Sequence, residues 1–346
     1  MFNYPTATVY SLKGAVAWLH TDRQIFRDEM NNAYPVKGVT AFNLMDRYAK
    51  GDDIIPFLNA YPQTNTIRVF CYTPKKDWGD YAWNTPSPNV VESFIKEMQV
   101  FGIRVKLVLL TDDDSARIQP AIELVEYLSP HKFNNLILAT ANEPYTHKYV
   151  NVNALEGVLK ASGYLYTSGV YEDLKLFYGN CGDIHTGRDN EWPRKAKDAI
   201  ECYRGGGPNF PDEPPQKVPW ILGEPIKPNE ANGDDNYILR DYYTYGALGK
   251  LTSGGMFFHC ESAKLSNLPD DFESRCANEL FTGYDMFPGD AALGDYEHLQ
   301  AYEDEGTRAL RVYRVGRYVV VVRPENFIPG NNWLAMDSIS VCWTIL

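Results

Sequence analysis

The sequence predicts an α/β protein built as a (β/α)8 TIM barrel, and three observations lead to this prediction. Short apolar runs rich in β-branched residues recur eight times along the chain, and segments with helical periodicity separate them. The runs are continuously apolar rather than alternating, which is typical of parallel strands buried on both faces. They span about 225 residues, close to the ~250 that such a barrel typically needs. The glycine fingerprint G-x-G-x-x-G of a dinucleotide-binding sheet does not follow the first run.

The expected strands share this composition and are bounded by turn-forming residues. In chain order they cover residues 36–42, 66–72, 103–110, 135–141, 164–170, 182–185, 219–223 and 254–259.

Amphipathic segments between these strands predict helices. Asn89 is expected to cap a helix over residues 90–101, because an Asn side chain can accept from the first free backbone N–H groups. Apolar stripes predict further helices around residues 121–128 and 155–159, and the longest is expected over residues 235–251. Between the fifth and sixth strands only residues 171–181 remain for a helix.

The chain divides into three expected parts. Residues 1–35 precede the first strand and are expected to cap the barrel floor, and residues 36–300 form the barrel. Residues 301–346 are expected to form a small β-rich C-terminal appendage, because apolar and polar residues alternate there as in antiparallel strands.

Charge and hydropathy exclude several classes of partner. The 346 residues carry a formal net charge of −12, which repels nucleic acid and anionic membrane surfaces. No apolar run approaches the ~18 residues of a membrane span, and no basic segment followed by an apolar one marks a secretory signal. The expected location is therefore the cytoplasm, or an exported site reached by a route that this chain does not encode.

The cysteines and the standard hydrolase motifs exclude other chemistries. Six scattered cysteines without a C-x-x-C pair indicate reduced thiols in or near the core rather than a disulfide scaffold. The sequence has neither zinc-ligand spacing nor the G-x-S-x-G elbow of a serine hydrolase.

Two glutamates directly follow predicted strands. The fourth strand runs into Asn142-Glu143-Pro144, and the seventh runs into Gly223-Glu224-Pro225. In a parallel barrel the reactive groups lie at the C-terminal ends of the strands, so both carboxylates are expected in one mouth. Two facing carboxylates are what glycoside hydrolysis requires, one as proton donor and the other as nucleophile or base.

These residues resemble clan A of the glycoside hydrolases, nearest to the cellulase- and mannanase-like family 5, over residues 36–262. The resemblance implies a retaining glycosidase that cleaves a β-linked bond in an oligo- or polysaccharide, without a metal or organic cofactor. It assigns the acid/base role to Glu143 and the nucleophile to Glu224, and it places Asn142 on the sugar 2-hydroxyl. Arg68 resembles the strand-two arginine that supports the nucleophile.

Other positions match the clan less closely. His185 resembles the histidine at the end of the sixth strand, but Gly187 stands where its usual tyrosine partner would be. After the eighth strand the clan usually has a tryptophan, whereas this chain has Phe258 and His259. These departures bear on activity and specificity more than on the fold.

The loop after the second strand carries Trp78 and Trp83, which are expected either to stack on sugar rings or to anchor the loop against the barrel rim.

Two other functions remain open. The first is a carbohydrate-binding or structural protein, such as a virion or cell-surface component, that keeps the barrel without turnover. The second is a barrel aldolase or lyase, which needs a lysine at a strand end for a Schiff base; Lys106 lies within a strand and Lys227 in a loop, so neither fits well. The sequence specifies neither the sugar and linkage nor the oligomeric state.

Overall fold

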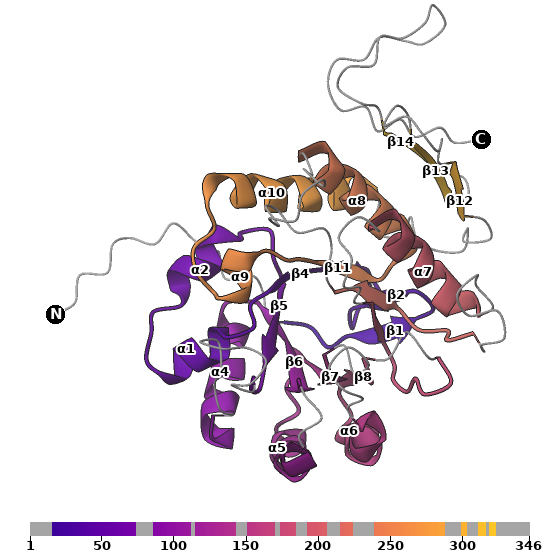
Figure 1. Cartoon of the computed structure of the whole chain (residues 1–346). Helices are drawn as coiled ribbons and strands as arrows, with labels where there is room; N and C mark the ends of the chain where they lie inside the picture. The colour runs from indigo at the N-terminus through magenta and orange to yellow at the C-terminus, as the bar shows by residue number, and fades with distance from the viewer. Residues whose placement is uncertain are drawn as a thin grey trace, which may run out of the picture.

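The computed structural model contains a barrel of eight parallel strands surrounded by helices (Figure 1). The strand order around the barrel is β8-β7-β6-β5-β4-β11-β10-β9. The predicted (β/α)8 fold is therefore confirmed. The structure describes residues 16–73, 86–111, 115–142, 151–169, 174–184, 192–205, 215–223, 239–287, 299–302, 311–315 and 318–322.

All eight predicted strands are present, and most are shorter at their ends than the apolar runs. They are β4 (Val36–Thr40), β5 (Thr66–Phe70), β6 (Arg104–Leu110), β7 (Leu136–Ala141), β8 (Leu165–Thr167), β9 (Gly182–Ile184), β10 (Trp220–Leu222) and β11 (Gly255–Phe258).

The barrel closes between β8 and β9 through a few backbone contacts rather than a strand ladder. The N–H groups of Asn180 and Cys181 donate to the carbonyl of Tyr166 at 3.0 and 3.3 Å. A single antiparallel bridge joins Thr167 to Gly179. This seam coincides with the segment in which the sequence left little room for a helix.

The helices pack around the strands. They are α1 (Leu44–Ala49), α2 (Ile55–Ala60), α4 (Pro88–Val100), α5 (Ile118–Leu128), α6 (Glu156–Ser162), α7 (Trp192–Arg204), α8 (Leu239–Thr252), α9 (Glu261–Lys264) and α10 (Asp271–Asp285).

The predicted cap of α4 is wrong. The N-cap residue is Ser87, and Pro88 occupies the first helical position, where its fixed φ fits and its missing N–H is not needed. Asn89 lies inside the helix, and its side-chain oxygen accepts a hydrogen bond from the Tyr127 hydroxyl at 2.7 Å.

Five helices, α1, α2, α7, α9 and α10, were not predicted from the sequence. Helix α10 crosses α8 closely (Figure 1). Glycines make this approach possible: a Cβ on Gly283 would lie 1.9 Å from the carbonyl oxygen of Tyr243, and one on Gly246 would lie 2.0 Å from that of Leu280.

A small antiparallel sheet precedes the barrel. It consists of β1 (His20–Asp22), β2 (Ile25–Arg27) and β3 (Ala33–Tyr34). Leu19 and Phe26 from this segment pack in one apolar cluster with Val36 and Ile137, which lie near the N-terminal ends of β4 and β7. The segment thus contacts the floor of the barrel.

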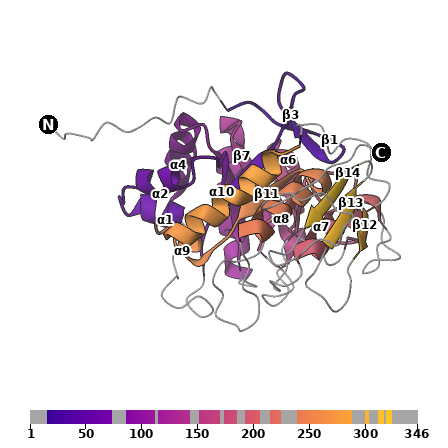
Figure 2. The same ribbon diagram turned by 90° about the horizontal axis from the view of Figure 1, so that it is seen from above.

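A second antiparallel sheet forms the β-rich C-terminal appendage. It contains β12 (Leu299–Tyr302), β13 (Arg311–Val315) and β14 (Tyr318–Val322). Strands β13 and β14 lie against α8 (Figure 2). Residues 323–346 of the expected appendage lie outside the described residues.

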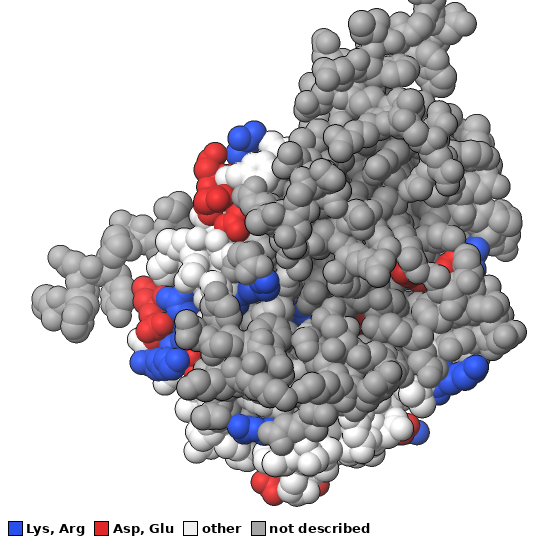
Figure 3. All heavy atoms as spheres, in the orientation of Figure 1, with Lys and Arg blue, Asp and Glu red and all other residues white. Residues whose placement is uncertain are grey.

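The described surface carries charges of both signs. On the face shown in Figure 3, Lys and Arg side chains lie interspersed with Asp and Glu side chains. Within the described ranges, no helix is long and apolar enough to cross a bilayer.

Candidate functional site at the C-terminal ends of the strands

Side chains alternate between the two faces of the barrel wall, as the pleat of a strand requires. On β5, Ile67 and Val69 belong to the large apolar core, whereas Arg68 and Phe70 belong to the barrel interior. Because of this alternation, a strand that is buried on both faces can carry a charged residue. The charged side chain then points into the barrel, where it meets side chains of other strands, rather than toward the helices.

The barrel interior contains two small apolar clusters at different heights. The lower cluster, nearer the N-terminal ends of the strands, consists of Leu19, Phe26, Val36, Ile137, Cys181, Ile221 and Phe257. The upper cluster consists of Phe42, Phe70, Val108 and Ala139. Lys106 and Asp183 also occupy inward positions, because Lys106 lies two residues from Val108 of the upper cluster and Asp183 lies two residues from Cys181 of the lower one.

Arg68 and Asn142 meet at the upper end of the interior. Both side chains are buried, at 0% and 2% exposed, and Nη2 of Arg68 donates a hydrogen bond to Oδ1 of Asn142. Asn142 directly follows β7, and its own N–H donates to the carbonyl of Leu110 on β6 at 3.0 Å. Two predicted site residues are therefore brought together.

Aromatic rings hold the arginine in place. The Arg68 guanidinium carbon lies 5.5 Å from the ring centre of Phe42 and 5.2 Å from that of Phe70. The two rings stack on each other with centres 4.0 Å apart. Cation–π contacts of a desolvated arginine contribute ~2 kcal/mol, so the rings fix the guanidinium as well as bury it.

His259 joins the same group. It follows β11, is buried, and its ring centre lies 5.7 Å from that of Phe42. Phe258, by contrast, belongs to the outer core, where it lies near Tyr61 and Tyr242. Of the two residues that the sequence offered at this strand end, His259 is the one beside the barrel interior.

A buried ion pair lies beside Arg68 in the barrel interior, because Lys106 is the register partner of Arg68 on the neighbouring strand. The Lys106 ammonium on β6 contacts Oδ2 of Asp183 on β9, and the side chains are 0% and 1% exposed. Burial lowers the pKa of Lys106, the Asp183 carboxylate opposes this change, and the Arg68 charge adds to it. The ammonium also lies 5.3 Å from the ring centre of Phe257.

The remaining predicted site residues lie outside the described residues. These are Glu143, Glu224, His185, Trp78 and Trp83. The described chain ends immediately before each glutamate, at Asn142 and at Gly223. The Gly223 N–H donates to the Ile184 carbonyl at 2.9 Å, and its carbonyl accepts from the Thr40 hydroxyl at 3.5 Å, which keeps the end of β10 in register with its neighbours.

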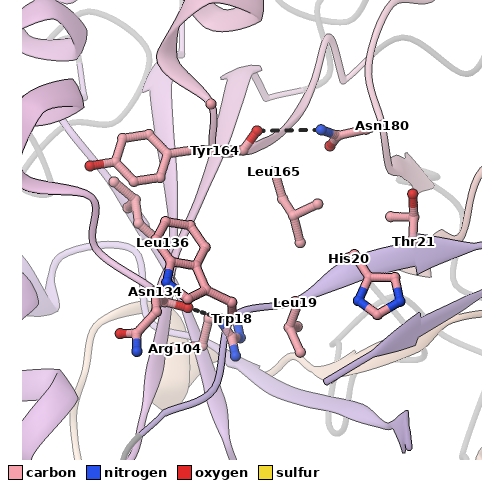
Figure 4. A pocket seen from close by; sticks show the side chains of 11 residues that line it. Trp18, Leu19, His20, Thr21, Arg104, Asn134, Leu136, Tyr164, Leu165 and Asn180 are labelled. Carbon is pink, nitrogen blue, oxygen red and sulfur yellow. Dashed lines mark hydrogen bonds between the residues drawn. The ribbon is translucent and has the colours of Figure 1, made fainter. Parts of the chain in front are cut away.

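A pocket of about 210 Å³ lies at the opposite end of the barrel (Figure 4). Trp18, Tyr164 and Arg104 are among the residues that line it. The Arg104 guanidinium donates hydrogen bonds to the backbone carbonyls of Asn134 and Ala17, so it binds the protein's own backbone. Arg104 begins β6, so the pocket lies at the N-terminal ends of the strands, away from Asn142.

In the described part of the chain, no group of His, Cys, Asp and Glu side chains is arranged to hold a metal ion. Cys71, Cys181, Cys202, Cys260 and Cys276 are all buried, and none of them forms a disulfide with another described residue, as predicted; Cys342 lies outside the described ranges.

The sequence interpretation missed Asp183 and treated Lys106 only as an unsuitable Schiff-base lysine. A signal was present in both cases. Each is a charged residue within a short run that is otherwise buried on both faces, and burying an isolated charge is costly unless a partner compensates it. Such positions indicate a partner inside the barrel.

Comparisons with known proteins show the same architecture. No protein-family model matches the sequence, and the search of curated proteins found no match. Among solved structures, the chain is similar to an endo-1,4-β-mannanase from Rhizomucor miehei, with a TM-score of 0.53, 10% identity, and coverage of 78% of this chain and 100% of that one.

Two bacterial enzymes are also similar. For a β-mannanase from Streptomyces thermolilacinus, solved with mannohexaose, the TM-score is 0.52, with 15% identity and coverage of 79% of this chain and 97% of that one. For the catalytic domain of a mannanase from Streptomyces sp. SirexAA-E, the TM-score is 0.50 and the identity is 16%, with coverage of 79% of this chain and 91% of that one. The chain therefore has the (β/α)8 fold of these glycoside hydrolases.

Proposed function

We propose that the protein is a retaining glycoside hydrolase acting on a β-linked polysaccharide. The observation that carries the proposal is the contact between Arg68 and Asn142 at the C-terminal end of the barrel. In the clan A resemblance, Arg68 supports the nucleophile Glu224 and Asn142 binds the sugar 2-hydroxyl, so this contact joins two residues of the proposed site. The fold, similar to that of mannanases, supports the same conclusion.

In the proposed mechanism Glu224 attacks the anomeric carbon and forms a glycosyl-enzyme. Glu143 protonates the leaving oxygen and then removes a proton from the incoming water. Arg68 keeps the nucleophile ionised, because a neighbouring cation favours a carboxylate over its protonated form. Asn142, fixed by Arg68, holds the sugar 2-hydroxyl, a contact that strengthens in the transition state of such enzymes.

The geometry implied by this mechanism is measurable. Retaining enzymes hold the two carboxyl groups ~5–5.5 Å apart, and inverting ones hold them ~6.5–9.5 Å apart. A crystal structure with the Glu143 and Glu224 carboxyls at the shorter separation would support retention. Either carboxyl on the outer face or the floor of the barrel would contradict the assignment.

The direct test is a substrate screen. Wild-type protein and Glu224→Gln are incubated with aryl β-mannoside and β-glucoside and with manno- and cello-oligosaccharides, because mannanases are among the proteins of similar fold. We expect the wild type to release product from at least one β-linked substrate and Glu224→Gln to release none. Equal release by both proteins would exclude Glu224 as nucleophile.

A second function is favoured by one observation at β11. Phe258 packs into the outer core and His259 follows it, so neither supplies the broad aromatic surface that clan A usually has after this strand. A barrel that binds carbohydrate without cleaving it would fit this difference. Saturable binding of an oligosaccharide by calorimetry, with no release from any substrate of the screen, would support this second function.

A further inference from the structure

Tyr178 lies at the seam of the barrel, in the segment that joins β8 to β9. Its hydroxyl contacts two residues that are far from it in the sequence. The hydroxyl oxygen lies 2.8 Å from Oγ1 of Thr140 on β7, and the hydroxyl donates a hydrogen bond to the backbone carbonyl of Val152. Thr140 lies two residues before Asn142, and Val152 lies ten residues after it. One side chain is thus bonded to the chain on both sides of Asn142.

The two hydrogen bonds of the Tyr178 hydroxyl have a defined direction. A carbonyl oxygen only accepts, so the single proton of the phenol goes to Val152, and the Thr140 hydroxyl donates to the phenol oxygen. Burial raises the pKa of Tyr178, which keeps the phenol protonated at neutral pH. The donor to Val152 is therefore present at every pH at which the protein would be assayed.

Tyr178 contacts β7 from the outer side of the barrel wall. Ile137 and Ala139 belong to the clusters inside the barrel, so the side chain of Thr140, the next residue, points to the opposite side. Thr140 is fully buried there. Tyr178 therefore acts on the barrel interior only through the strand that it contacts.

The backbone of Tyr178 is fixed to the end of β8. Its carbonyl accepts from the Ser168 N–H at 2.9 Å, and its N–H donates to the Ser168 hydroxyl at 3.3 Å. The residue after Ser168, Gly169, has a φ of +76° and approaches β7 so closely that a Cβ there would lie 2.4 Å from the carbonyl oxygen of Ala141. Ala141 directly precedes Asn142. Tyr178 and the ends of β7 and β8 therefore form one connected group next to Asn142.

This group lies where the barrel wall has few backbone hydrogen bonds. A few contacts and one bridge join β8 to the segment before β9, so the full strand ladder of β8 is with β7 alone. Regions with few such bonds open more easily than the rest of a fold. The side-chain bonds of Tyr178 add to the restraint on the ends of these two strands.

We propose that Tyr178 is a positioning residue for Asn142: by bonding to both Thr140 and Val152, its hydroxyl holds the end of β7 where Asn142 binds the sugar 2-hydroxyl. This role rests on the proposed function, in which the contact with the 2-hydroxyl strengthens in the transition state. Without the phenol oxygen both bonds are lost together, and the end of β7 is free to shift. An interaction that matters most in the transition state affects kcat more than KM, so the loss should appear in kcat.

The test compares Tyr178→Phe with Tyr164→Phe. Each substitution removes one oxygen atom and keeps the ring. Tyr164 is a matched control because its hydroxyl also has two partners: it donates to the Leu128 carbonyl at 2.6 Å and accepts from the Phe133 N–H at 3.3 Å. Tyr164 directly precedes β8, so it lies at the opposite end of the barrel from Asn142.

Two readouts are needed. The first is amide hydrogen exchange of Asn142, whose N–H donates to the Leu110 carbonyl, and it requires no turnover. The second is kcat and KM on a 4-nitrophenyl β-glycoside that is cleaved in the substrate screen, and on the 2-deoxy analogue of that glycoside. The analogue lacks the hydroxyl that Asn142 is proposed to bind. A loss of positioning therefore affects the parent glycoside alone, whereas a general loss of structure affects both.

We expect Tyr178→Phe to accelerate the exchange of the Asn142 amide and to lower kcat on the parent glycoside, each about tenfold, within the range that the loss of two hydrogen bonds allows. On the 2-deoxy analogue kcat should fall about twofold or less. Tyr164→Phe should change neither the exchange of Asn142 nor the ratio of kcat between the two substrates. Equal losses of kcat on both substrates in Tyr178→Phe, or unchanged exchange of Asn142, would overturn the proposal.

Two variants of Thr140 test the same contact from β7, and they replace Tyr178→Phe if that protein does not fold. Thr140→Val removes the hydroxyl and keeps the shape, so it should change the ratio of kcat between the two substrates in the same direction as Tyr178→Phe. Thr140→Ser keeps the hydroxyl and should retain the wild-type ratio. A wild-type ratio in Thr140→Val, or a changed one in Thr140→Ser, would contradict the proposal. A protein that cleaves no glycoside would reject the glycosidase, and the exchange of Asn142 would then decide the role of Tyr178 by itself.

Discussion

Arg68 and Asn142 are 74 positions apart in the sequence and form a direct side-chain hydrogen bond inside the barrel. Their strands are not neighbours, since β6 lies between β5 and β7 in the sheet. The guanidinium reaches past β6 because the inward positions of a closed barrel converge on its axis. This contact fixes the residue immediately before Glu143 and connects the fold to the proposed chemistry.

The first prediction concerns the shape of the Arg68 side chain. Arg68→Lys keeps a charge but loses the planar fork that can contact Asn142 while stacking on Phe42 and Phe70. A hydrogen bond to a charged group contributes ~1.5–3 kcal/mol, so we expect kcat/KM to fall roughly 10- to 100-fold. Steady-state kinetics and thermal unfolding of the same preparation measure activity and stability together.

Arg104 supplies a matched control for this variant. It too is a buried arginine on a barrel strand, and its guanidinium carbon lies 5.1 Å from the ring centre of Tyr34, but it lies at the N-terminal end of β6. Arg104→Lys should lower the melting temperature and leave kcat/KM near the wild-type value. Equal losses of kcat/KM in both variants would show that Arg68 acts only through stability.

The second prediction concerns the crossing of α8 and α10. Gly283→Ala places a Cβ 1.9 Å from the Tyr243 carbonyl oxygen, so the helices must separate. Overpacking of this kind costs ~1–3 kcal/mol, and we expect a loss at the upper end because the clash is with backbone. Urea unfolding gives the free energy of unfolding for each variant.

Gly157→Ala is the control for the glycine variants. Gly157 lies in α6 with nothing within 4 Å of an added Cβ, so alanine should stabilise the helix by up to ~1 kcal/mol. Gly283→Ala as stable as wild type would mean that the two helices do not approach as closely as described.

The third prediction concerns thiol reactivity. Burial raises the pKa of Cys181 and that of Cys276, each to about 12. Only the thiolate reacts, and its fraction at pH 8 is then ~10⁻⁴ at these residues. Iodoacetamide at pH 8 should leave both unmodified in the native protein and alkylate both after denaturation, as read by mass spectrometry. Rapid alkylation of either residue in the native state would contradict its burial.

How far the sequence predicted the fold depended on whether the signal was local. The eight strands were found because burial on both faces leaves an apolar run within a few residues, as in β6 and β7. Helix α10 was missed although its start carries a local signal. Asp270 and Glu273 form a capping box, with each side chain bound to the other's backbone N–H.

The interior of the site was less predictable because its contacts are not local. Arg68 and Asn142 were each proposed from a resemblance, but only the register of three strands brings them together. Asp183 and Lys106 lie on different strands, and neither run of sequence reveals the other. The placement of Glu143 and Glu224 remains a prediction.

The central claim is that Glu143 and Glu224 have different roles in one retaining mechanism. Dinitrophenolate leaves a dinitrophenyl β-glycoside without being protonated, so Glu143→Ala should still form the glycosyl-enzyme from this substrate. Hydrolysis of the glycosyl-enzyme should then be slow, because no base remains to activate water. Added azide needs no base and should accelerate turnover to give the β-glycosyl azide. On an unactivated glycoside the same variant should lose the ~10²–10⁴-fold that acid–base catalysis contributes.

Glu224→Ala is the comparison that decides the roles. It should form no covalent intermediate by intact-protein mass spectrometry, and azide should give the product of inverted configuration. The most direct measurement is therefore azide rescue of the two variants with the stereochemistry of each glycosyl azide read by NMR. We predict the β-azide from Glu143→Ala and the α-azide from Glu224→Ala. Equal loss on activated and unactivated substrates, with rescue of neither variant, would contradict the assignment.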